Sequence, residues 1–303
     1  MNFRKPLPAQ LPPAFSVADA YTRGFTRGQL RNSALTAPFH GTRVAAATPL
    51  SLELACRAVA TRMPPGTAFS HRTAARLHGM PLPLFADTLL DVTVPAPRRA
   101  PRPAGVRGHS ALLHPTDTVA IANGTLTVTS VERTCCDLAG VLALPDLVAA
   151  VDSLLWHEEP QTTVTKLADA IERYPARAGR PALRRALALS SDHSRSRPES
   201  LVRVDLALSS LPTPVANFEV YLRTARRTVY LDLAYPEYKL ELEYHGDQHR
   251  TDRRQWRSDI RRTNDVGDEG WQALQFTGDD LPDLPNLRRR VERRLRMLGW
   301  TGQ

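Results

Sequence analysis

The sequence predicts an α+β protein of several domains, with an N-terminal winged helix-turn-helix, a mixed α/β middle region and a C-terminal α/β sheet flanked by helices. Three observations carry this prediction. The 303 residues are enough for two or three domains. The hydrophobic period changes along the chain from helical spacing to strand alternation and back. A Ser/Arg/Pro-rich stretch before Glu199 interrupts both patterns.

Residues 1–48 are predicted to form the winged helix-turn-helix. A short helix over 15–21 is followed by a turn and by a second helix over 27–33, which the Thr26 hydroxyl can cap. Residues 39–44 then form a short β-wing. Arg27 and Arg31 on the second helix are the predicted nucleic-acid-binding residues, since guanidinium groups suit phosphates and base edges. The alternative is a helical hairpin whose polar residues face solvent.

Residues 49–174 alternate between helical and strand signals. Helices are predicted over 52–62, 70–78, 130–142 and 145–156, and strands over 89–94 and 125–129. Residues 175–198 are predicted to be a linker that contains a short Leu/Ala/Arg helix, because their Ser, Arg and Pro run cannot bury much surface. The remaining segment, 199–303, is therefore predicted to be a separate domain.

Asp232, Glu243 and His245 form the predicted centre of a site in the C-terminal domain. Strands are predicted over 217–221, 227–234, 238–244 and 272–277, with a turn at Pro236-Glu237. Side chains alternate between the two faces of a strand, so Glu243 and His245 share a face, and the hairpin brings Asp232 beside them. Glu241 shares that face, where it can equally belong to a row of solvated acids.

Carboxylates that converge at a strand end suit a hard divalent cation. Mg²⁺ or Mn²⁺ takes oxygen ligands and several waters, so Asp232 and Glu243 are the predicted metal ligands. A metal held in this way can bind a scissile phosphate and activate a water molecule. His245 and His249 are further catalytic candidates, because imidazole moves protons near neutral pH, although a single histidine is more often a surface or packing residue.

A charged helix is predicted over 251–268, beside this site. Arg250, Arg254 and Arg257 are its candidates for gripping a nucleic-acid backbone, where each contact would release counterions. Aspartates are interspersed among these arginines. The alternative is therefore a solvated helix with Asp–Arg pairs along its surface, each of which contributes little.

The composition is compatible with a cytoplasmic protein that binds nucleic acid. The net charge is +9, and the surplus lies before residue 199, since residues 199–303 carry equal numbers of acidic and basic side chains. An arginine-rich, GC-biased genome would give the same excess. The three cysteines match neither a disulfide framework nor a zinc site, which favours a reducing compartment. No run of about 18 apolar residues occurs, so we expect no membrane partner.

From Pro198 onward the sequence resembles the Vsr-like branch of the PD-(D/E)xK nucleases, and more narrowly a set of actinobacterial nuclease-like proteins. The matching stretches are Pro198-Glu199-Ser200, Asp232-Leu233-Ala234, 243–249, Asp259-Ile260-Arg261-Arg262, Gly270-Trp271 and 277–281. The resemblance implies a restriction-endonuclease-like sheet, with Asp232 and Glu243 as metal-binding acids and Glu199 as a supporting helical glutamate. His245 takes the place of the usual lysine, as the histidine of Vsr endonucleases does. The actinobacterial proteins usually have aspartate there, and Gly267 also departs from their pattern.

The N-terminal half is similar to AbiEi-type antitoxin regions on two stretches, 70–79 and 129–139. That resemblance implies a winged helix that binds DNA, although the first stretch also has a structural account, as a capped helix with closely packed alanines. The combined prediction is a metal-dependent DNA endonuclease directed by an N-terminal DNA-binding module. The alternative is a non-catalytic DNA-binding regulator of antitoxin type. DNA is the predicted partner, with a homodimer and, for the regulator, a toxin partner left open.

Overall fold

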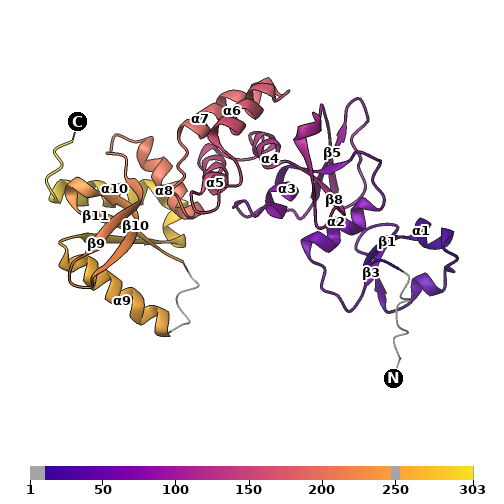
Figure 1. The fold of residues 1–303 in the computed structure, drawn as a ribbon, viewed down its shortest axis with the longest axis horizontal. Helices are drawn as coiled ribbons and strands as arrows, with labels where there is room; N and C mark the ends of the chain where they lie inside the picture. Colours follow the sequence, from indigo (N-terminus) through magenta and orange to yellow (C-terminus); the bar gives the residue numbers. More distant parts are fainter. Residues whose placement is uncertain (1–10, 247–252, 303) are drawn as a thin grey trace. The chain divides into compact units, whose positions relative to one another are not determined.

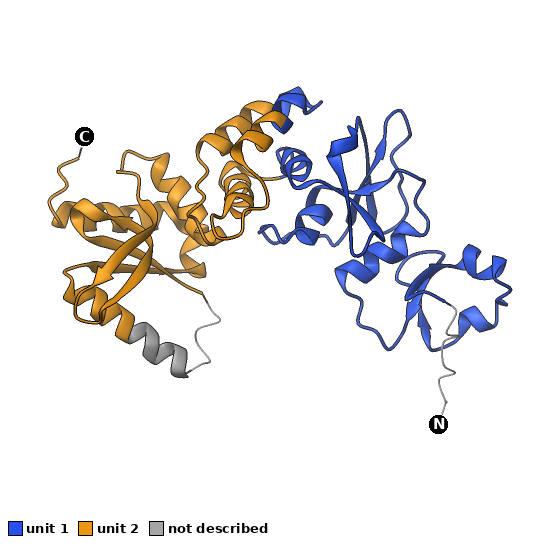
Figure 2. Ribbon diagram, in the orientation of Figure 1, with its two compact units in different colours: residues 1–141, 170–179 blue, residues 142–169, 180–303 orange. Residues whose placement is uncertain are grey.

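The computed structural model describes residues 11–246 and 253–302, and for residues 253–260 it describes the backbone alone. The described chain is an α+β protein whose strands form three sheets (Figure 1). It divides into two compact units, shown in Figure 2: residues 1–141 and 170–179 form unit 1, and residues 142–169 and 180–303 form unit 2. Within the described ranges, no helix combines the length and the apolar composition needed to cross a membrane.

Unit 1 begins with a three-stranded antiparallel sheet of strand order β1-β3-β2. Ser16 starts the first helix, because its hydroxyl accepts the amide N–H of Asp19 and so caps the helix. Phe15, Ala20 and Leu30 pack together as a small core. The elements are β1 (Ala14–Ser16), α1 (Val17–Thr22), the 3₁₀ turn η1 (Gln29–Arg31), β2 (Leu35–Thr36) and β3 (Thr42–Ala45).

The prediction of a second helix over 27–33 is wrong. The chain forms only the three-residue turn η1 and becomes extended again at Asn32, whose side-chain oxygen accepts the Ala34 amide. Leu30 is the single buried residue of this turn. One buried side chain gives a helix little tertiary support, and short helices need that support to form in water. Arg27 and Arg31 therefore lie on a loop and a single turn.

The rest of unit 1 is built on a five-stranded sheet of order β6-β5-β4-β8-β7, in which β4 runs antiparallel to β5 and parallel to β8. The buried side chains of Phe69, Val92 and Val128 form the centre of its core. The helices and the two strands predicted in this region are confirmed, whereas β4, β6 and β7 were not predicted. The elements are α2 (Leu52–Ala60), β4 (Ala68–Phe69), α3 (His71–Leu77), β5 (Leu90–Pro95), β6 (Val106–Ala111), η2 (Pro115–Asp117), β7 (Thr118–Ile121), β8 (Leu126–Thr129) and α4 (Val131–Leu138).

The two sheets of unit 1 are joined by shared apolar packing. Ala14 and Val44 of the first sheet pack against Leu54 and Ala58 of α2. Phe39 contacts both this cluster and the core of the five-stranded sheet. Residues 14–45 and the chain that follows them are therefore parts of one compact unit.

Unit 2 carries a four-stranded sheet of order β12-β11-β10-β9, with β12 parallel to β11 and the other pairs antiparallel. Val202 of α8 and Val291 of α10 pack with Leu233 on one face, and Val266 of α9 packs with Leu231 on the other. The four strands and the flanking helices predicted here are confirmed. The elements are α8 (Arg197–Ala207), β9 (Val215–Leu222), β10 (Arg227–Tyr235), η4 (Pro236–Tyr238), β11 (Leu240–His245), α9 (Arg253–Asp268), β12 (Gln272–Thr277), η6 (Gly278–Asp283) and α10 (Leu284–Met297).

The segment before α8 is held to it by a buried polar network. Asp152 accepts hydrogen bonds from the Ser200 hydroxyl and from Arg203, each at 2.7 Å. The stretch predicted as a linker, 175–198, contains a helix whose Leu183 and Ala186 are buried. The elements are α5 (Leu144–Leu155), α6 (Val164–Arg173), η3 (Arg177–Gly179) and α7 (Arg180–Ala188).

Candidate active site

Asp232 lies one residue beyond the end of the pairing between β10 and β11. The β10–β11 ladder runs through Tyr235↔Leu240 and Ala234↔Glu241 and ends at Leu233↔Leu242. Beyond that pair, the Asp232 carboxylate itself accepts the Tyr244 amide N–H at 2.9 Å. A side-chain oxygen thus takes the role that a strand carbonyl has in a regular ladder, and it fixes this carboxylate between the two strands.

The other neighbour of Asp232 is irregular as well. Pairing between β9 and β10 includes Leu231↔Phe218 and Leu233↔Ala216 but omits the position between them. Asn217, which lies there, has a φ of 49°, a left-handed conformation that asparagine tolerates better than most residues. The side chains of Leu231 and Leu233 consequently enter the cores on opposite faces of the sheet. Asp232 lies at this change of face.

Glu241 and Glu243 lie on the face of β11 that α9 covers, as strand parity predicted. Arg262 of α9 donates from Nη2 to Glu241 Oε1 at 2.8 Å and from Nη1 to Glu243 Oε1. Its Nη2 also donates to the Tyr230 carbonyl at 2.9 Å. The solvated acid row considered for Glu241 is wrong, because this side chain is only 1% exposed. A buried charged pair of this kind keeps both carboxylates oriented at the sheet surface.

His245 extends the same row toward the end of the strand. Its Nε2 lies 3.2 Å from Glu243 Oε2. Gln275 of the parallel strand β12 donates to that same oxygen at 3.3 Å. The His245 Nε2 atom is buried, yet it has no hydrogen-bond partner within the described part of the chain. An imidazole nitrogen beside a carboxylate and free of other bonds can accept or donate a proton to a bound molecule.

Glu199 reaches this region from the first turn of α8. Its carboxylate accepts hydrogen bonds from the Ser196 hydroxyl at 2.7 Å and from the Arg195 amide at 2.9 Å, so it also stabilises the start of the helix. Burial, together with the negative charge of Asp232, raises the pKa of Glu199 to about 7. The electrostatic effect of Asp232 shows that the structure brings these two predicted residues together.

The carboxylates of this cluster are difficult to ionise together. Burial raises the pKa of Glu241 to about 7, with Arg262 opposing the shift and Glu243 adding to it. Burial is also the main cause that raises the pKa of Asp232, and the Tyr244 amide opposes it. Added positive charge would stabilise the ionised forms of these acids. The cluster therefore favours the binding of a cation or of a proton.

The donor set matches a hard cation in type but does not by itself enclose one. Carboxylate oxygens from Asp232 and Glu243 are the ligands that Mg²⁺ or Mn²⁺ prefers, and such ions commonly use one or two carboxylates plus water and substrate phosphate. The raised pKa of Asp232 fits a site that is stabilised by added positive charge. Among the described residues, however, no group of three or more His, Cys, Asp or Glu side chains is arranged as a metal site.

The remaining predicted residues are distributed as follows. His249 and Arg250 lie outside the described residues. Arg254 and Arg257 belong to α9, but their side chains lie outside the described part as well. Arg27 and Arg31 belong to unit 1, whereas the acid cluster belongs to unit 2.

Comparison with known proteins adds a distant similarity in structure. No family model and no curated protein matches this sequence. The crystal structure of the RV2827C protein from Mycobacterium tuberculosis is similar to 72% of this chain and to 86% of its own, with 17% sequence identity and a TM-score of 0.42.

Arg262 and Gln275 are the functional candidates that the sequence reasoning missed. Arg262 lies in the charged helix that the sequence predicted over 251–268, yet its side chain points to the sheet and not to solvent. A signal was present, because the buried Val266 follows it by one helical turn and residues at i and i+4 share a helix face. Gln275 pairs with Glu243 in the β11–β12 register, which only the parallel topology reveals.

Proposed function

We propose that unit 2 contains the active site of a DNA endonuclease that hydrolyses phosphodiester bonds with Mg²⁺ or Mn²⁺. The observation that carries this proposal is the meeting of Asp232, Glu243 and His245 where the β10–β11 ladder ends. The resemblance of residues 198–281 to Vsr-like nucleases assigns the same three positions. In this proposal Asp232 and Glu243 would hold the ion, whose charge would polarise the scissile phosphate and activate a water molecule.

Residues of the chain itself supply proton transfer and orient the carboxylates. His245 Nε2 lies 3.2 Å from Glu243 Oε2 without a hydrogen-bond partner among the described residues, and in this proposal it moves a proton to or from the attacking water. Glu199, with its pKa near 7, exchanges a proton at neutral pH beside Asp232. Arg262 holds Glu241 and one oxygen of Glu243, so the other Glu243 oxygen, Oε2, is the one directed toward His245.

The proposal includes DNA binding by unit 1, in which the predicted winged helix-turn-helix is the directing module. Its support is the antiparallel sheet of order β1-β3-β2, in which β1 precedes α1 and the other two strands follow η1, together with the exposed side chains of Arg27 and Arg31. Because η1 is a three-residue turn and not a recognition helix, we expect unit 1 to contact DNA phosphates more than base edges. Such contacts give binding that depends strongly on salt and little on sequence.

Cleavage of supercoiled plasmid, single-stranded DNA and mismatched duplex with Mg²⁺ or Mn²⁺ tests the enzyme. Asp232→Asn and Glu243→Gln should each abolish cleavage, because each removes a charged ligand while keeping the side-chain shape. Glu237→Gln is the matched control, since Glu237 is an exposed acid in the turn of the same hairpin. A wild-type protein that cuts no faster than the Asp232→Asn variant rules the endonuclease out.

One observation favours a second function, a non-catalytic DNA-binding regulator. The guanidinium of Arg262 already supplies a counter-ion to Glu241 and Glu243, so the cluster can be stable without metal. Mn²⁺ titration by calorimetry distinguishes the two proposals. The regulator predicts no metal-dependent heat and unchanged DNA affinity in Asp232→Asn, whereas the enzyme predicts a binding isotherm that this substitution removes.

A further inference from the structure

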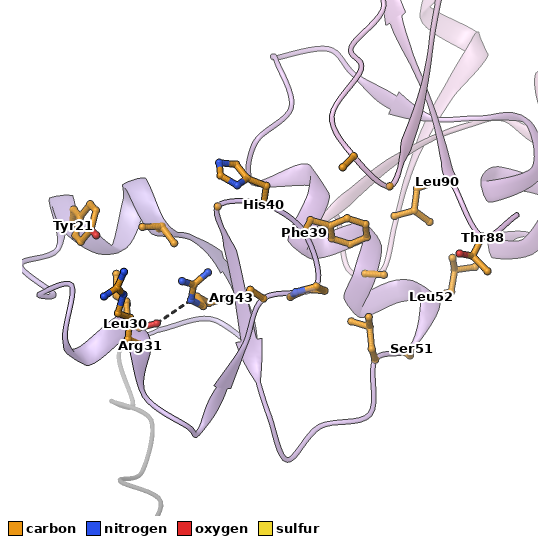
Figure 3. A pocket seen from close by; sticks show the side chains of 18 of the residues that line it. Tyr21, Leu30, Arg31, Phe39, His40, Arg43, Ser51, Leu52, Thr88 and Leu90 are labelled. Atoms are coloured by element: carbon orange, nitrogen blue, oxygen red, sulfur yellow. Dashed lines mark hydrogen bonds between the residues drawn. The ribbon is translucent and has the colours of Figure 1, made fainter.

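A cavity of about 960 Å³ opens in unit 1 between the three-stranded sheet and the five-stranded sheet. Its walls come from the loop before β3, from the start of α2 and from β5, and Figure 3 shows it from close by. Ligand-binding sites in proteins commonly have volumes of roughly 300–1,000 Å³. The cavity is therefore large enough for a ligand of nucleotide size.

The charge of the lining has one sign. Arg27, Arg31, Arg43 and Arg76 all line the cavity, and the described residues around it include no aspartate or glutamate. Four guanidinium groups around one concave surface repel one another, so a bound anion would relieve this repulsion. Guanidinium is also the side-chain group that best matches phosphate, because its planar fork binds two oxygens at once.

The cavity has two chemically different ends. In Figure 3, Arg31 and Arg43 lie at one end with the ring of Tyr21 close by, and Leu52 and Leu90 lie at the other. Thr88 is an exposed residue on the rim of this apolar end. The arrangement matches a ligand with a charged phosphate at one end and a less polar ring system at the other.

The walls are held in place by the fold. Arg43 donates from Nε to the Leu30 carbonyl at 2.9 Å and from Nη1 to its neighbour's carbonyl at 2.7 Å, which fixes the guanidinium. The loop before β3 is fixed as well, because Arg62 donates to the His40 carbonyl and Phe39 packs closely on Gly105. A preformed site loses little conformational entropy when its ligand binds.

We propose that this cavity binds a nucleotide through its 5′-phosphate, with the phosphate among the arginines and the base at the Leu52–Leu90 end. The nucleotide can be free or can be the end of a single strand, since both present the same chemistry. The inference goes beyond the proposed endonuclease, because it needs no metal and places a nucleotide in a cavity of unit 1, where Arg27 and Arg31 hold its phosphate instead of contacting a DNA backbone from the surface.

Isothermal titration calorimetry of the full chain with AMP, adenosine, inorganic phosphate and a 5′-phosphorylated oligonucleotide tests the proposal. AMP should bind at least tenfold more tightly than phosphate, and adenosine should give no measurable binding. The Arg27→Ala/Arg31→Ala double variant should weaken AMP binding at least tenfold. Thr88→Trp, which fills the apolar end, should weaken AMP binding while leaving phosphate binding unchanged.

Two controls separate this site from general charge and from the endonuclease. Arg99→Ala removes an exposed arginine of the same unit that does not line the cavity, and it should leave AMP binding unchanged. Asp232→Asn should also bind AMP normally, even if it abolishes cleavage. Oligonucleotide binding more than tenfold tighter than AMP identifies the strand end as the ligand. Equal affinities for phosphate and AMP, or an equal loss in Arg99→Ala, overturn the proposal.

Discussion

Replacing Arg262 with methionine should destabilise unit 2 strongly, and more so at alkaline pH. Arg262 is the guanidinium that neutralises Glu241 and Glu243, which are 1% and 7% exposed. Removing one partner of a buried ion pair typically costs about 3–5 kcal/mol, because a charge is left buried without compensation. Methionine retains most of the volume of the arginine stem, so the loss is mainly electrostatic.

Protonation limits this cost and sets its pH dependence. The pKa of Glu241 is about 7 with Arg262 present, and Arg262 is a cause that lowers it. In the variant the pKa is therefore higher, so the folded state binds more protons than the folded wild type does. Between the wild-type pKa of about 7 and the higher pKa of the variant, each unit of pH therefore adds about 1.4 kcal/mol to the cost of the substitution. We expect a loss of about 1 kcal/mol at pH 5.5, where the cost is that of lost hydrogen bonds, and of about 2–3 kcal/mol at pH 8.

Urea titrations followed by tryptophan fluorescence measure this selectively. All four tryptophans of the chain lie in unit 2, so the signal reports the unfolding of that unit. Arg227→Met is the matched control, because Arg227 also joins β10 to α9, through Asp265 at 2.9 Å, but both partners are partly exposed. Such surface pairs contribute about 0–1 kcal/mol. If Arg262→Met costs no more than Arg227→Met at pH 8, or costs the same at pH 5.5, the reasoning is refuted.

Three further predictions follow from burial, cavity and backbone effects. Glu199→Gln should make the stability of unit 2 less dependent on pH. The pKa of Glu199 is raised from 4.5 to about 7, so the wild-type free energy of unfolding falls by about 3 kcal/mol as pH rises through that interval. Urea titrations at pH 5 and pH 8 should therefore differ less in the variant than in the wild type. Leu233→Ala, in the centre of the sheet core, should cost about 2–5 kcal/mol at either pH by the same titration. Gly105→Ala should lower the thermal midpoint of unit 1 in circular dichroism more than Gly124→Ala does. Both glycines have positive φ, but only at Gly105 would a Cβ lie 2.8 Å from Phe39, so equal shifts would contradict this account.

Local sequence patterns predicted most of the four-stranded sheet of unit 2, because strand alternation and turn residues indicate the same elements there. Alternation along 240–245 placed Glu241 and Glu243 on one face, and the Pro236 turn fixed the hairpin that carries Asp232. In unit 1, local sequence patterns did not predict the structure of residues 27–33. Arg27 to Ser33 contains helix-forming residues, but only Leu30 is buried, and the tertiary support that decides between a helix and a turn cannot be read locally.

The residues that contact the acids of the candidate site come from distant segments of the chain, and no local sequence pattern encodes how these segments meet. Arg262 meets Glu243 because α9 returns across the sheet, and Gln275 meets it because β12 pairs in parallel with β11. The break at Asn217 is a backbone conformation that the residue permits but does not require. The sequence could therefore name the acids of the site and place Arg262 on the helix face of Val266, but it could not show which acids that guanidinium neutralises.

The packing of Phe39, Ala14 and Val44 has a consequence for building chimeras of this protein. A chain started at residue 49 would leave Leu54 and Ala58 of α2 uncovered, and the resulting apolar patch would favour aggregation. A cut between the two compact units meets a different obstacle, since the backbone passes from one to the other three times, after residues 141, 169 and 179. No single junction thus yields two intact halves, and exchange of parts with another protein requires at least the whole stretch 142–179 to travel with one partner.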